Sequence, residues 1–434
     1  MNFQKICVLG LGYIGLPTAS TFATHGLEVI GVDVNTKVVE TLKNGGLHIH
    51  EPGLRTLVRA ALGSGNLRIS DQPESADAFI IAVPTPFLAD KRADMSFVRA
   101  AAGAIAPYLT PGNLVVLEST SPPRTTVEMV APILERSRLV AGEDFLLAYS
   151  PERVLPGQIL RELIENARVI GGINETSALA GRDLYSTFVR GEIVLTDATT
   201  AEMVKLMENT YRDVNIAIAN EFSRLADRFG VDVWEANRLA NRHPRVEILN
   251  PGPGVGGHCI GVDPWFLVEA APDITQLIQS ARQVNDQQPE YVLELIRSAL
   301  SDGDSTGSLR GKRIVALGLS YKANVDDLRE SPAIEICKHL VDAGALVSAY
   351  EPYKADLNIP GLKCEISLED ALINAELIVL LVPHTALVTL DPHKLAGITP
   401  ARTLVDVVNG WTDRSWQEAG FRITRLGAGT MSGQ

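Results

Sequence analysis

Short apolar runs separated by helix-like stretches organise the first 150 residues. The runs lie at 6–9, 29–32, 78–83, 114–117 and 145–149. The first run, a turn at Gly10 to Gly15, a helix from Leu16 to His25 and the second run together predict a βαβ unit. The later runs extend this unit, so the pattern predicts a doubly wound α/β domain on a parallel sheet of about six strands.

A different periodicity follows between residues 199 and 229, where apolar positions advance in steps of three or four. This spacing predicts one long amphipathic helix, of a length that commonly links domains or packs against its copy in a dimer. The stripe consists of Met203, Met207, Tyr211, Val214, Ile218, Phe222, Leu225 and Phe229. At roughly 100° per residue, Lys205, Asn209 and Arg212 fall nearly opposite this stripe. Further helix is predicted to about residue 242 and from 273 to 300.

The strand pattern of the first domain returns after a polar, Gly/Ser-rich linker at 301–308. Residues 312–318 (KRIVALG) echo 5–10 (KICVLG), and 376–383 (ELIVLLVP) echo 77–84 (DAFIIAVP). The second copy lacks the glycine triplet of the first, which indicates a related sheet with a different ligand. We therefore divide the chain into 1–198, a central helical and dimerisation region at 199–300, and 309–434.

Length and charge narrow the class of protein. The chain has 434 residues, enough for two or three domains, and no apolar run approaches the roughly 20 residues of a membrane span. Its net charge of −13 opposes binding to nucleic acid or anionic lipid, and an anionic substrate would need a locally basic pocket. No targeting segment is evident at the start, which favours the cytoplasm. The four cysteines show no metal-binding spacing and are expected to be reduced.

A dinucleotide site is predicted at Gly10-Leu-Gly12-Tyr13-Ile14-Gly15, which fits GxGxxG between a strand and a helix. The glycines let a pyrophosphate approach the helix N-terminus, and Asp33 at the end of the next strand can accept hydrogen bonds from ribose hydroxyls. The Asp33 charge would repel a 2′-phosphate, so NAD is favoured over NADP. A tight structural turn and an FAD site are the alternatives.

Several other segments have both a chemical and a structural interpretation. Thr85 and Thr120 end two later strands, where ligands of doubly wound sheets bind, although such positions are often only turns. Cys259 follows a glycine-rich loop and precedes a helix start, which favours a nucleophilic thiolate over a buried structural cysteine. The basic residues on the long helix and near its end have an alternative as ordinary solvated surface. That alternative also applies to Lys322 and Arg329.

Taken in order, five features resemble the UDP-glucose/GDP-mannose dehydrogenase family over nearly the whole chain. They are the glycine fingerprint, 150–157 (SPERVLPG), Lys205-x-x-x-Asn209, the glycine loop with Cys259-x-x-x-Asp263, and 327–331 (DLRES). The resemblance implies two Rossmann-like domains joined by the long helix, a homodimer or higher oligomer built on that helix, and a UDP-sugar bound between the domains.

Within the family, residues 240–246 (ANRHPRV), 253–259 (PGVGGHC) and 263–266 (DPWF) are similar to the branch that oxidises UDP-N-acetyl-D-mannosamine. UDP-glucose enzymes usually have Ser and Lys where this chain has His258 and Val262. They also often carry a Glu near Pro156, so the acid/base role of that Glu is not transferred. The UDP-N-acetyl-D-glucosamine 6-dehydrogenases lie close by and remain an alternative substrate class.

The resemblance implies a four-electron oxidation of the sugar C6 hydroxyl to a carboxylate, with two NAD consumed, for bacterial surface polysaccharide synthesis. Lys205 would accept the proton or stabilise the oxyanion together with Asn209. Cys259 would form a thiohemiacetal and then a thioester, and Asp263 would orient the cysteine and the lysine. Thr120 and Glu152 would position the water or the reacting hydroxyl. Thr85, Thr120 and Arg329 would also contact NAD. The substrate contacts would come from Arg153, Val154, Lys205, Asn209, Arg212, His243, Arg245, Gly254, Tyr321 and Lys322.

Two other functions remain as rivals. A one-step dehydrogenase of small hydroxy acids would use a similar glycine fingerprint and long helix but would not need Cys259. A non-catalytic NAD-binding protein would have no use for a nucleophile near a lysine. The ordered set Lys205, Asn209, Cys259 and Asp263 therefore favours the double oxidation.

Overall fold

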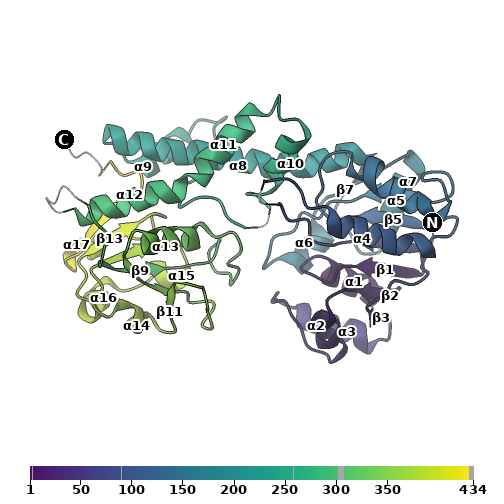
Figure 1. Cartoon of the computed structure of the whole chain (residues 1–434), viewed down its shortest axis with the longest axis horizontal. Coiled ribbons are helices and arrows are strands. Elements are labelled where there is room, and N and C mark those ends of the chain that lie inside the picture. Colours follow the sequence, from purple (N-terminus) through teal and green to yellow (C-terminus); the bar gives the residue numbers. More distant parts are fainter. Residues whose placement is uncertain (2, 89, 258, 302–306, 430–434) are drawn as a thin grey trace. The chain divides into compact units, whose positions relative to one another are not determined.

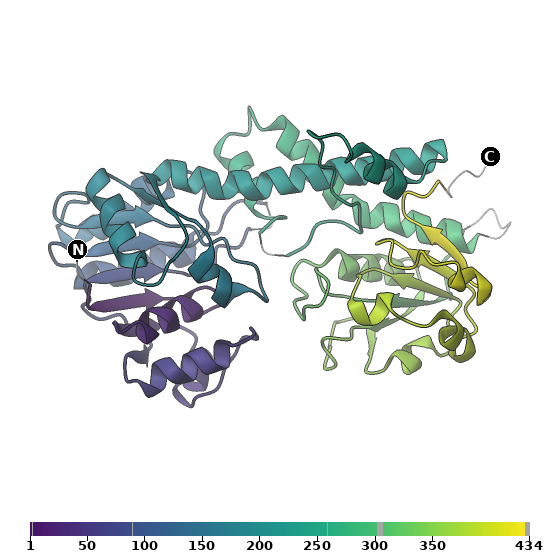
Figure 2. The same ribbon diagram turned by 180° about the vertical axis from the view of Figure 1, so that it is seen from behind.

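The computed structural model describes residues 1, 3–88, 90–257, 259–301 and 307–429. His258 and most of the predicted linker at 301–308 lie outside the described residues. The chain forms two compact units, the first of Met1–Glu208 with Trp265–Pro272 and the second of Asn209–Pro264 with Asp273–Gln434. The change from one unit to the other falls inside α8 (Ala198–Phe229), a single uninterrupted helix that is easily followed in Figure 2. The three-part division of the chain stays a prediction.

The first unit is built on an eight-stranded sheet in the order β3-β2-β1-β4-β5-β6-β7-β8 (Figure 1). Every neighbouring pair is parallel except β6 and β7, which are antiparallel. The strands are β1 (Lys5–Leu9), β2 (Glu28–Val32), β3 (Leu67–Ser70), β4 (Ala78–Ile81), β5 (Leu114–Leu117), β6 (Leu146–Tyr149), β7 (Arg168–Gly172) and β8 (Ile193–Asp197). The doubly wound prediction is confirmed, and β1 to β6 are the six parallel strands expected. The prediction did not include β7 and β8, which extend the sheet through an antiparallel pairing with β6.

Alternate residues of the first sheet face two separate cores, as the two-residue period of a strand requires. Ile6 and Val8 lie in one core with α1, α3 and α7, while Cys7 and Leu9 lie in the other with α4 and α5. Helices therefore cover both faces of the sheet. The helical elements are α1 (Gly15–Thr24), α2 (Thr36–Lys43), α3 (Leu54–Gly63), α4 (Ser96–Ile105), η1 (Ala106–Tyr108), the π-helical turn η2 (Thr126–Val130), α5 (Ala131–Leu134), η3 (Glu135–Ser137), α6 (Ile159–Glu165), α7 (Glu175–Tyr185) and α10 (Asp263–Ala270).

The second unit repeats this plan with six parallel strands in the order β11-β10-β9-β12-β13-β14. Figure 1 shows α12 and α13 on one side of this sheet and α14 and α16 on the other. The strands are β9 (Arg313–Leu317), β10 (Leu346–Tyr350), β11 (Lys363–Glu365), β12 (Leu377–Leu380), β13 (Thr403–Asp406) and β14 (Arg422–Arg425). The helices are α9 (Val233–Ala240), α11 (Gln276–Asp286), α12 (Gln288–Leu300), α13 (Pro332–Asp342), α14 (Leu368–Leu372), α15 (Thr385–Val388), α16 (Pro392–Ile398) and α17 (Ser415–Glu418).

The predicted duplication extends to the turn after the first strand of each sheet. Gly10 donates its N–H to Val32 and Leu11 donates to Asp33, and in the second sheet Gly318 and Leu319 donate to Tyr350 and Glu351 in the same way. The second carboxylate, however, is buried and also bonded to a histidine ring, His384 (Nε2–Oε2 3.1 Å). The second copy has therefore kept the sheet and turned this acid inward, which fits a different ligand.

The burial of α8 corrects the prediction made from its periodicity. Its buried face is largely polar and includes Lys205, Asn209 and Asp213, whereas most of the apolar stripe is exposed, with Met207 at 57% and Tyr211 at 67%. Arg212 is exposed as well and does not share the burial of the two polar residues with which it was grouped. The period of the helix was predicted correctly, but the face that packs inward was not.

One further difference concerns helix length. The predicted helix from 273 to 300 is interrupted at Gln287, because Pro289 begins a new helix, α12, in its first turn. Among the described residues, no helix is long and apolar enough to cross a membrane.

Candidate active site

The glycine turn after β1 has the shape that a dinucleotide requires. Gly10 has φ +92°, and a Cβ there would lie 2.4 Å from the carbonyl oxygen of Ala82, while a Cβ on Gly15 would lie 1.8 Å from that of Gly10. Gly12 differs, because nothing lies within 4 Å of where its Cβ would be. The fold itself does not need glycine there, but a pyrophosphate approaching the start of α1 does. The turn therefore fits NAD.

Asp33 follows β2 beside this turn. Its Oδ2 accepts from the N–H of Leu11 (2.9 Å) and its Oδ1 from that of Asn35 (2.8 Å). These two bonds fix the carboxylate at the carboxyl end of the strand, and each oxygen keeps a second lone pair for a ribose hydroxyl. The arrangement is consistent with the predicted preference for NAD.

We expect Asp33→Ala to narrow the ratio of kcat/KM between NAD and NADP by about tenfold or more. The change removes an acceptor for the ribose hydroxyls and the charge that repels a 2′-phosphate. Steady-state kinetics with both cofactors measures the ratio, and Asn35→Ala, which loses only a helix cap, serves as the control. Equal use of NADP by the wild type would show that Asp33 does not select the cofactor.

The two threonines predicted from strand ends lie at the same edge of the sheet. Thr85 comes after β4 and Thr120 after β5, and both are half-buried. Ser119 joins the two loops, because its Oγ donates to the carbonyl oxygen of Val83 (2.7 Å). With the glycine turn and Asp33, these loops form the carboxyl edge at which doubly wound folds bind ligands.

A buried glutamate from α8 holds the chain beyond Thr120. Glu202 accepts from the N–H of Arg124 (2.6 Å) and from both the N–H (2.8 Å) and the hydroxyl (2.6 Å) of Thr126. Burial raises the pKa of Glu202 to about 7, against the hydrogen bonds from Thr126, which lower it. The helix that carries Lys205 thus also anchors the loop that carries Thr120. The sequence interpretation did not include Glu202.

We expect Glu202→Gln to lower the free energy of unfolding by about 1–3 kcal/mol, because one amide oxygen cannot accept from donors on both sides. The folded pKa lies above the ordinary value of 4.5, so the wild type gains stability from this group at low pH and loses it as the pH rises toward 7. The difference in stability between wild type and variant should therefore be larger at pH 5 than at pH 8. Denaturant titrations measure it, with the exposed Glu128→Gln as control, and no difference at either pH would contradict the assignment.

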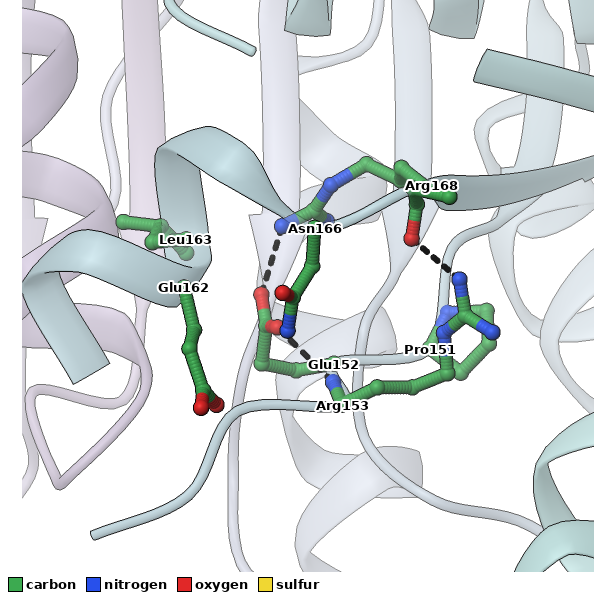
Figure 3. Close-up of a pocket in the computed structure, with 8 residues that line it drawn as sticks. Pro151, Glu152, Arg153, Glu162, Leu163, Asn166 and Arg168 are labelled. Atoms are coloured by element: carbon green, nitrogen blue, oxygen red, sulfur yellow. Dashed lines mark hydrogen bonds and ion pairs between the residues drawn. The ribbon is translucent and has the colours of Figure 1, made fainter. Parts of the chain in front are cut away.

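The loop after β6 presents Glu152, Arg153 and Val154. Arg153 bonds to Glu208 of α8 (Nη1–Oε1 2.7 Å) and to the carbonyl oxygen of Ala167. The loop is shaped further along by Glu51, whose carboxylate is buried and accepts from the N–H groups of residues 157 and 159. Figure 3 shows the small pocket beside this loop, with Arg153 turned toward the carbonyl group and Glu152 toward Arg168.

Part of the predicted catalytic set is brought together in the second unit. The Asn209 amide of α8 donates to Asp263 Oδ2 (2.6 Å), and the Asp263 N–H donates to the carbonyl oxygen of Cys259 (2.8 Å). Cys259 therefore lies in the turn that leads into α10. Lys205 precedes Asn209 by one helical turn on α8 and is buried, as is Asn209, with each 7% exposed. The surface interpretation of this pair is wrong.

Cys259 is exposed, in contrast to Cys7 and Cys337, which are buried, and none of the chain's four cysteines, all of them described, forms a disulfide. Exposure favours the nucleophile over the buried structural cysteine. The glycines before it pack against main chain and an aromatic ring: a Cβ on Gly256 would lie 2.5 Å from the carbonyl oxygen of Glu330, and one on Gly257 would lie 2.8 Å from the ring of Tyr321.

The remaining predicted binding residues are placed as follows. Tyr321 and Lys322 follow β9 at the carboxyl edge of the second sheet and are half-buried, as is Gly254. Arg329 is exposed, and its guanidinium bonds to Asp327 (Nε–Oδ1 2.8 Å). Three more of the predicted binding residues are also exposed, namely Arg212 on α8 and His243 and Arg245 after α9.

Sequence reasoning also missed a buried ion-pair cluster behind Glu152. Glu118, Arg168 and Tyr185 contribute to it, and each is at least nine-tenths buried. Burial raises the pKa of Glu118 to about 7, although the nearby Arg168 lowers it. The available signal was positional, because Glu118 directly precedes the Ser119-Thr120 turn at the end of a strand.

A doubly wound unit with this glycine turn and acidic strand end is characteristic of NAD-dependent dehydrogenases. The sequence matches the UDP-glucose/GDP-mannose dehydrogenase family in three domains. They are the NAD binding domain at residues 4–189, the central domain at 199–287 and the UDP binding domain at 315–413. The chain belongs to this family and is an NAD-dependent nucleotide-sugar dehydrogenase.

Individual relatives are similar over almost the full length. A UDP-N-acetyl-D-mannosamine dehydrogenase of Methanococcus maripaludis is 47% identical over 99% of this chain and 98% of its own length. An NDP-N-acetyl-D-galactosaminuronic acid dehydrogenase of Ralstonia nicotianae is 50% identical over 95% of this chain and 97% of its own length. The solved structure of a UDP-D-ManNAc dehydrogenase from Pyrococcus horikoshii has a TM-score of 0.91 and 39% identity, covering 98% of this chain and 100% of that one.

Proposed function

We propose that this chain oxidises the C6 hydroxyl of UDP-N-acetyl-D-mannosamine to a carboxylate, giving UDP-N-acetyl-D-mannosaminuronate. The observation that carries this proposal is the Asn209–Asp263–Cys259 arrangement, with Lys205 one turn away on the same buried face of α8. A hydroxyl oxidation needs a group that holds an oxyanion, and a second oxidation to the acid needs a nucleophile. The similarity to UDP-N-acetyl-D-mannosamine dehydrogenases supports the choice of sugar.

NAD, when bound, supplies the hydride acceptor for each oxidation. In the first oxidation, the proposed role of Lys205 is to take the hydroxyl proton or to hold the developing alkoxide. A cation kept out of bulk water is well suited to this, since the interaction is stronger in a medium of low dielectric constant. The Asn209 amide adds a second donor, and Thr120 and Glu152 position the hydroxyl or the attacking water.

In the second oxidation, the Cys259 thiolate adds to the aldehyde carbon at C6, forming a C–S bond and a thiohemiacetal. Loss of hydride from that carbon converts it to a thioester. Water then breaks the C–S bond, giving the carboxylate and restoring the thiol. The Asp263 side chain accepts from Asn209, and its N–H donates to the carbonyl oxygen of Cys259 in the turn before α10, so its proposed role is to hold both residues in place.

The anionic nucleotide explains the basic residues proposed to bind it. Arg153 and Val154 would contact the sugar, with Arg212, His243 and Arg245 near the sugar or diphosphate and Gly254 on the glycine loop. Tyr321 and Lys322 would hold the UDP part, and Arg329 would contact NAD. Guanidinium and ammonium groups are the donors that proteins use for diphosphates, and they offset locally a net charge of −13.

Parallel NADH assays on purified protein test the sugar. We expect the highest kcat/KM with UDP-N-acetyl-D-mannosamine, compared with UDP-N-acetyl-D-glucosamine, UDP-N-acetyl-D-galactosamine and UDP-glucose. The galactosamine epimer is included because of the Ralstonia relative. A preference of tenfold or more for another sugar would overturn the specificity and leave the dehydrogenase class intact.

We also propose a homodimer, or a higher oligomer, built on α8. An apolar stripe on this helix is exposed in the single chain, which is unusual for a helix of this length and favours a second copy as its cover. The exposed members are Met207, Tyr211, Ile218, Phe222, Leu225 and Phe229. Such an enzyme would work in the cytoplasm, where NAD and nucleotide sugars are available, and its uronate product would serve surface polysaccharide synthesis.

We expect the double variant Ile218→Asp/Phe222→Asp to halve the particle mass measured by light scattering after gel filtration. Two charges in an apolar interface are desolvated without partners, which outweighs the contact energy of the stripe. Arg228→Gln, an exposed change off the stripe on the same helix, should leave the mass unchanged. An unchanged mass in the double variant would place the interface elsewhere.

A further inference from the structure

A fully enclosed arginine lies directly behind Glu152. Arg168 begins β7, and its side chain is 5% exposed. Its guanidinium donates to Glu152 Oε2 (2.5 Å), Ser150 Oγ (3.1 Å) and Glu118 Oε1 (3.3 Å). The charge also lies over the ring of Tyr185, with 4.3 Å from the guanidinium carbon to the ring centroid. Figure 3 shows the bond from Arg168 to Glu152 at the wall of the pocket.

The sheet topology explains how these residues meet. The β6–β7 pair is antiparallel, with Ala148 opposite Gly172 and Tyr149 opposite Gly171. Continued past the end of β6, this register places Glu152 opposite Arg168. Because β7 runs antiparallel to β6, its first residue, Arg168, lies at the edge of the sheet where the parallel strands end.

Glu118 occupies the other side of the guanidinium. It follows β5, which is parallel to β6, and its side chain is fully buried. Its Oε1 also accepts from the hydroxyl of Tyr185 (2.6 Å), whereas its Oε2 is buried and has no hydrogen-bond partner among the described residues. The Arg168 guanidinium thus lies between the carboxylates of Glu118 and Glu152, and of these two acids it is Glu152 that lines the pocket.

We propose that Arg168 is the positioning residue for Glu152, holding its carboxylate in one place at the ligand edge of the sheet. This inference rests on the role of Glu152 in the proposed function. A guanidinium suits the task because its planar donors reach both acids and the serine from one rigid group. A buried cation that is paired on both sides also has little freedom to move.

The test separates positioning from simple charge balance. Arg168→Met leaves two buried acids without a cation, so we expect a fall in Tm of roughly 10 °C. The double variant Glu118→Gln/Arg168→Met removes one acid as well, and its Tm should return to within a few degrees of wild type. Its kcat should nevertheless stay at least tenfold low, with KM for NAD unchanged. A merely structural role would instead restore kcat together with Tm.

Wild-type kcat in the double variant would overturn the inference, because Arg168 would then serve only to neutralise Glu118. If the double variant stays unstable, Arg168→Lys decides. Lysine keeps the charge but not the planar donors, so kcat at least fivefold low at near-normal Tm supports positioning, and unchanged kcat overturns it. Tyr185→Phe, which loses only the hydrogen bond to Glu118, is the matched control with kcat near wild type.

Glu152→Gln distinguishes a failure of the inference from a failure of the proposed function. We expect about a hundredfold loss of kcat in this variant. Wild-type turnover in Glu152→Gln would remove the proposed role of Glu152 and the inference with it. A large loss in Glu152→Gln with normal turnover in the Arg168 variants would overturn the inference alone.

Discussion

Cys259→Ser is expected to lower kcat by several orders of magnitude while the Kd for NAD stays within about twofold of wild type. A serine hydroxyl near pH 7 is a far weaker nucleophile than a thiolate, so capture of the aldehyde fails. Cys259 is exposed, and its side chain is not part of a buried core, so the substitution should leave the fold intact. Stopped-flow NADH absorbance and calorimetric titration of NAD provide the two measurements.

Cys364→Ser is the matched control for the thiol. This cysteine lies on β11, is half-buried, and bonds to the carbonyl oxygen of Leu362 (3.8 Å). Its substitution should leave kcat within about twofold of wild type, because surface and edge changes usually have small effects. Near-normal uronate formation by Cys259→Ser would contradict covalent catalysis by this residue.

Lys205→Ala carries the second large effect, a fall in kcat of roughly a hundredfold or more at nearly unchanged Tm. Deleting one group that stabilises an oxyanion typically costs this much, and alanine is a strong helix former in α8. A lysine on a solvated face could be replaced with an effect within about 0.5 kcal/mol and no kinetic change. Lys205 is buried, so it is not a lysine of a solvated helix face.

Arg228→Ala controls for loss of a cation from the same helix, since Arg228 is exposed and should leave kcat unaltered. On α8 itself, the next basic residue after Lys205 is Arg212, which lies nearly two turns away and is exposed, so it is not placed to replace the lysine. A wild-type kcat in Lys205→Ala would remove α8 from the proposed catalytic machinery.

The strand pattern and the glycine turn were predictable because each depends on local sequence. A buried parallel strand reads as a short apolar run, and GxGxxG marks a turn whose backbone has no space for a Cβ at Gly10 or Gly15. The second sheet followed from its repeated apolar runs. The positions of the candidate residues Asp33, Thr85 and Thr120 at this edge were predictable for the same reason, since the strands themselves fix the carboxyl edge of a doubly wound sheet. Their roles remain proposals.

The strands β7 and β8 could not be predicted so easily. β7 ends in Gly171 and Gly172, which are unfavourable in strands, yet a Cβ on either would lie within about 2.3 Å of backbone oxygen. β8 is only partly buried along its length, so it lacks the signal of a core strand. Because β7 was missed, so was Arg168, which reaches Glu152 only through the antiparallel register.

The inward face of α8 was mispredicted for a physical reason. Periodicity gives the angle between two faces of a helix but not which of them packs inside, and the usual rule buries the apolar one. Here buried polar groups pair with one another, as Asp213 does through Oδ1 with Arg282 (2.5 Å) and Asn285 (2.9 Å), and these pairings allow the polar face to pack inward. In the proposed dimer a second copy would cover the apolar face, and the sequence of one chain does not indicate such a contact.

The number of NADH formed per sugar consumed tests the central claim most directly. A limiting amount of UDP-N-acetyl-D-mannosamine is converted to completion with excess NAD, absorbance counts the NADH, and mass spectrometry identifies the product. We predict two NADH per sugar, with the uronate as the product, because in the proposed mechanism Cys259 captures the aldehyde for a second oxidation on the same enzyme. One NADH per sugar, with an aldehyde or ketone as the final product, would contradict the account.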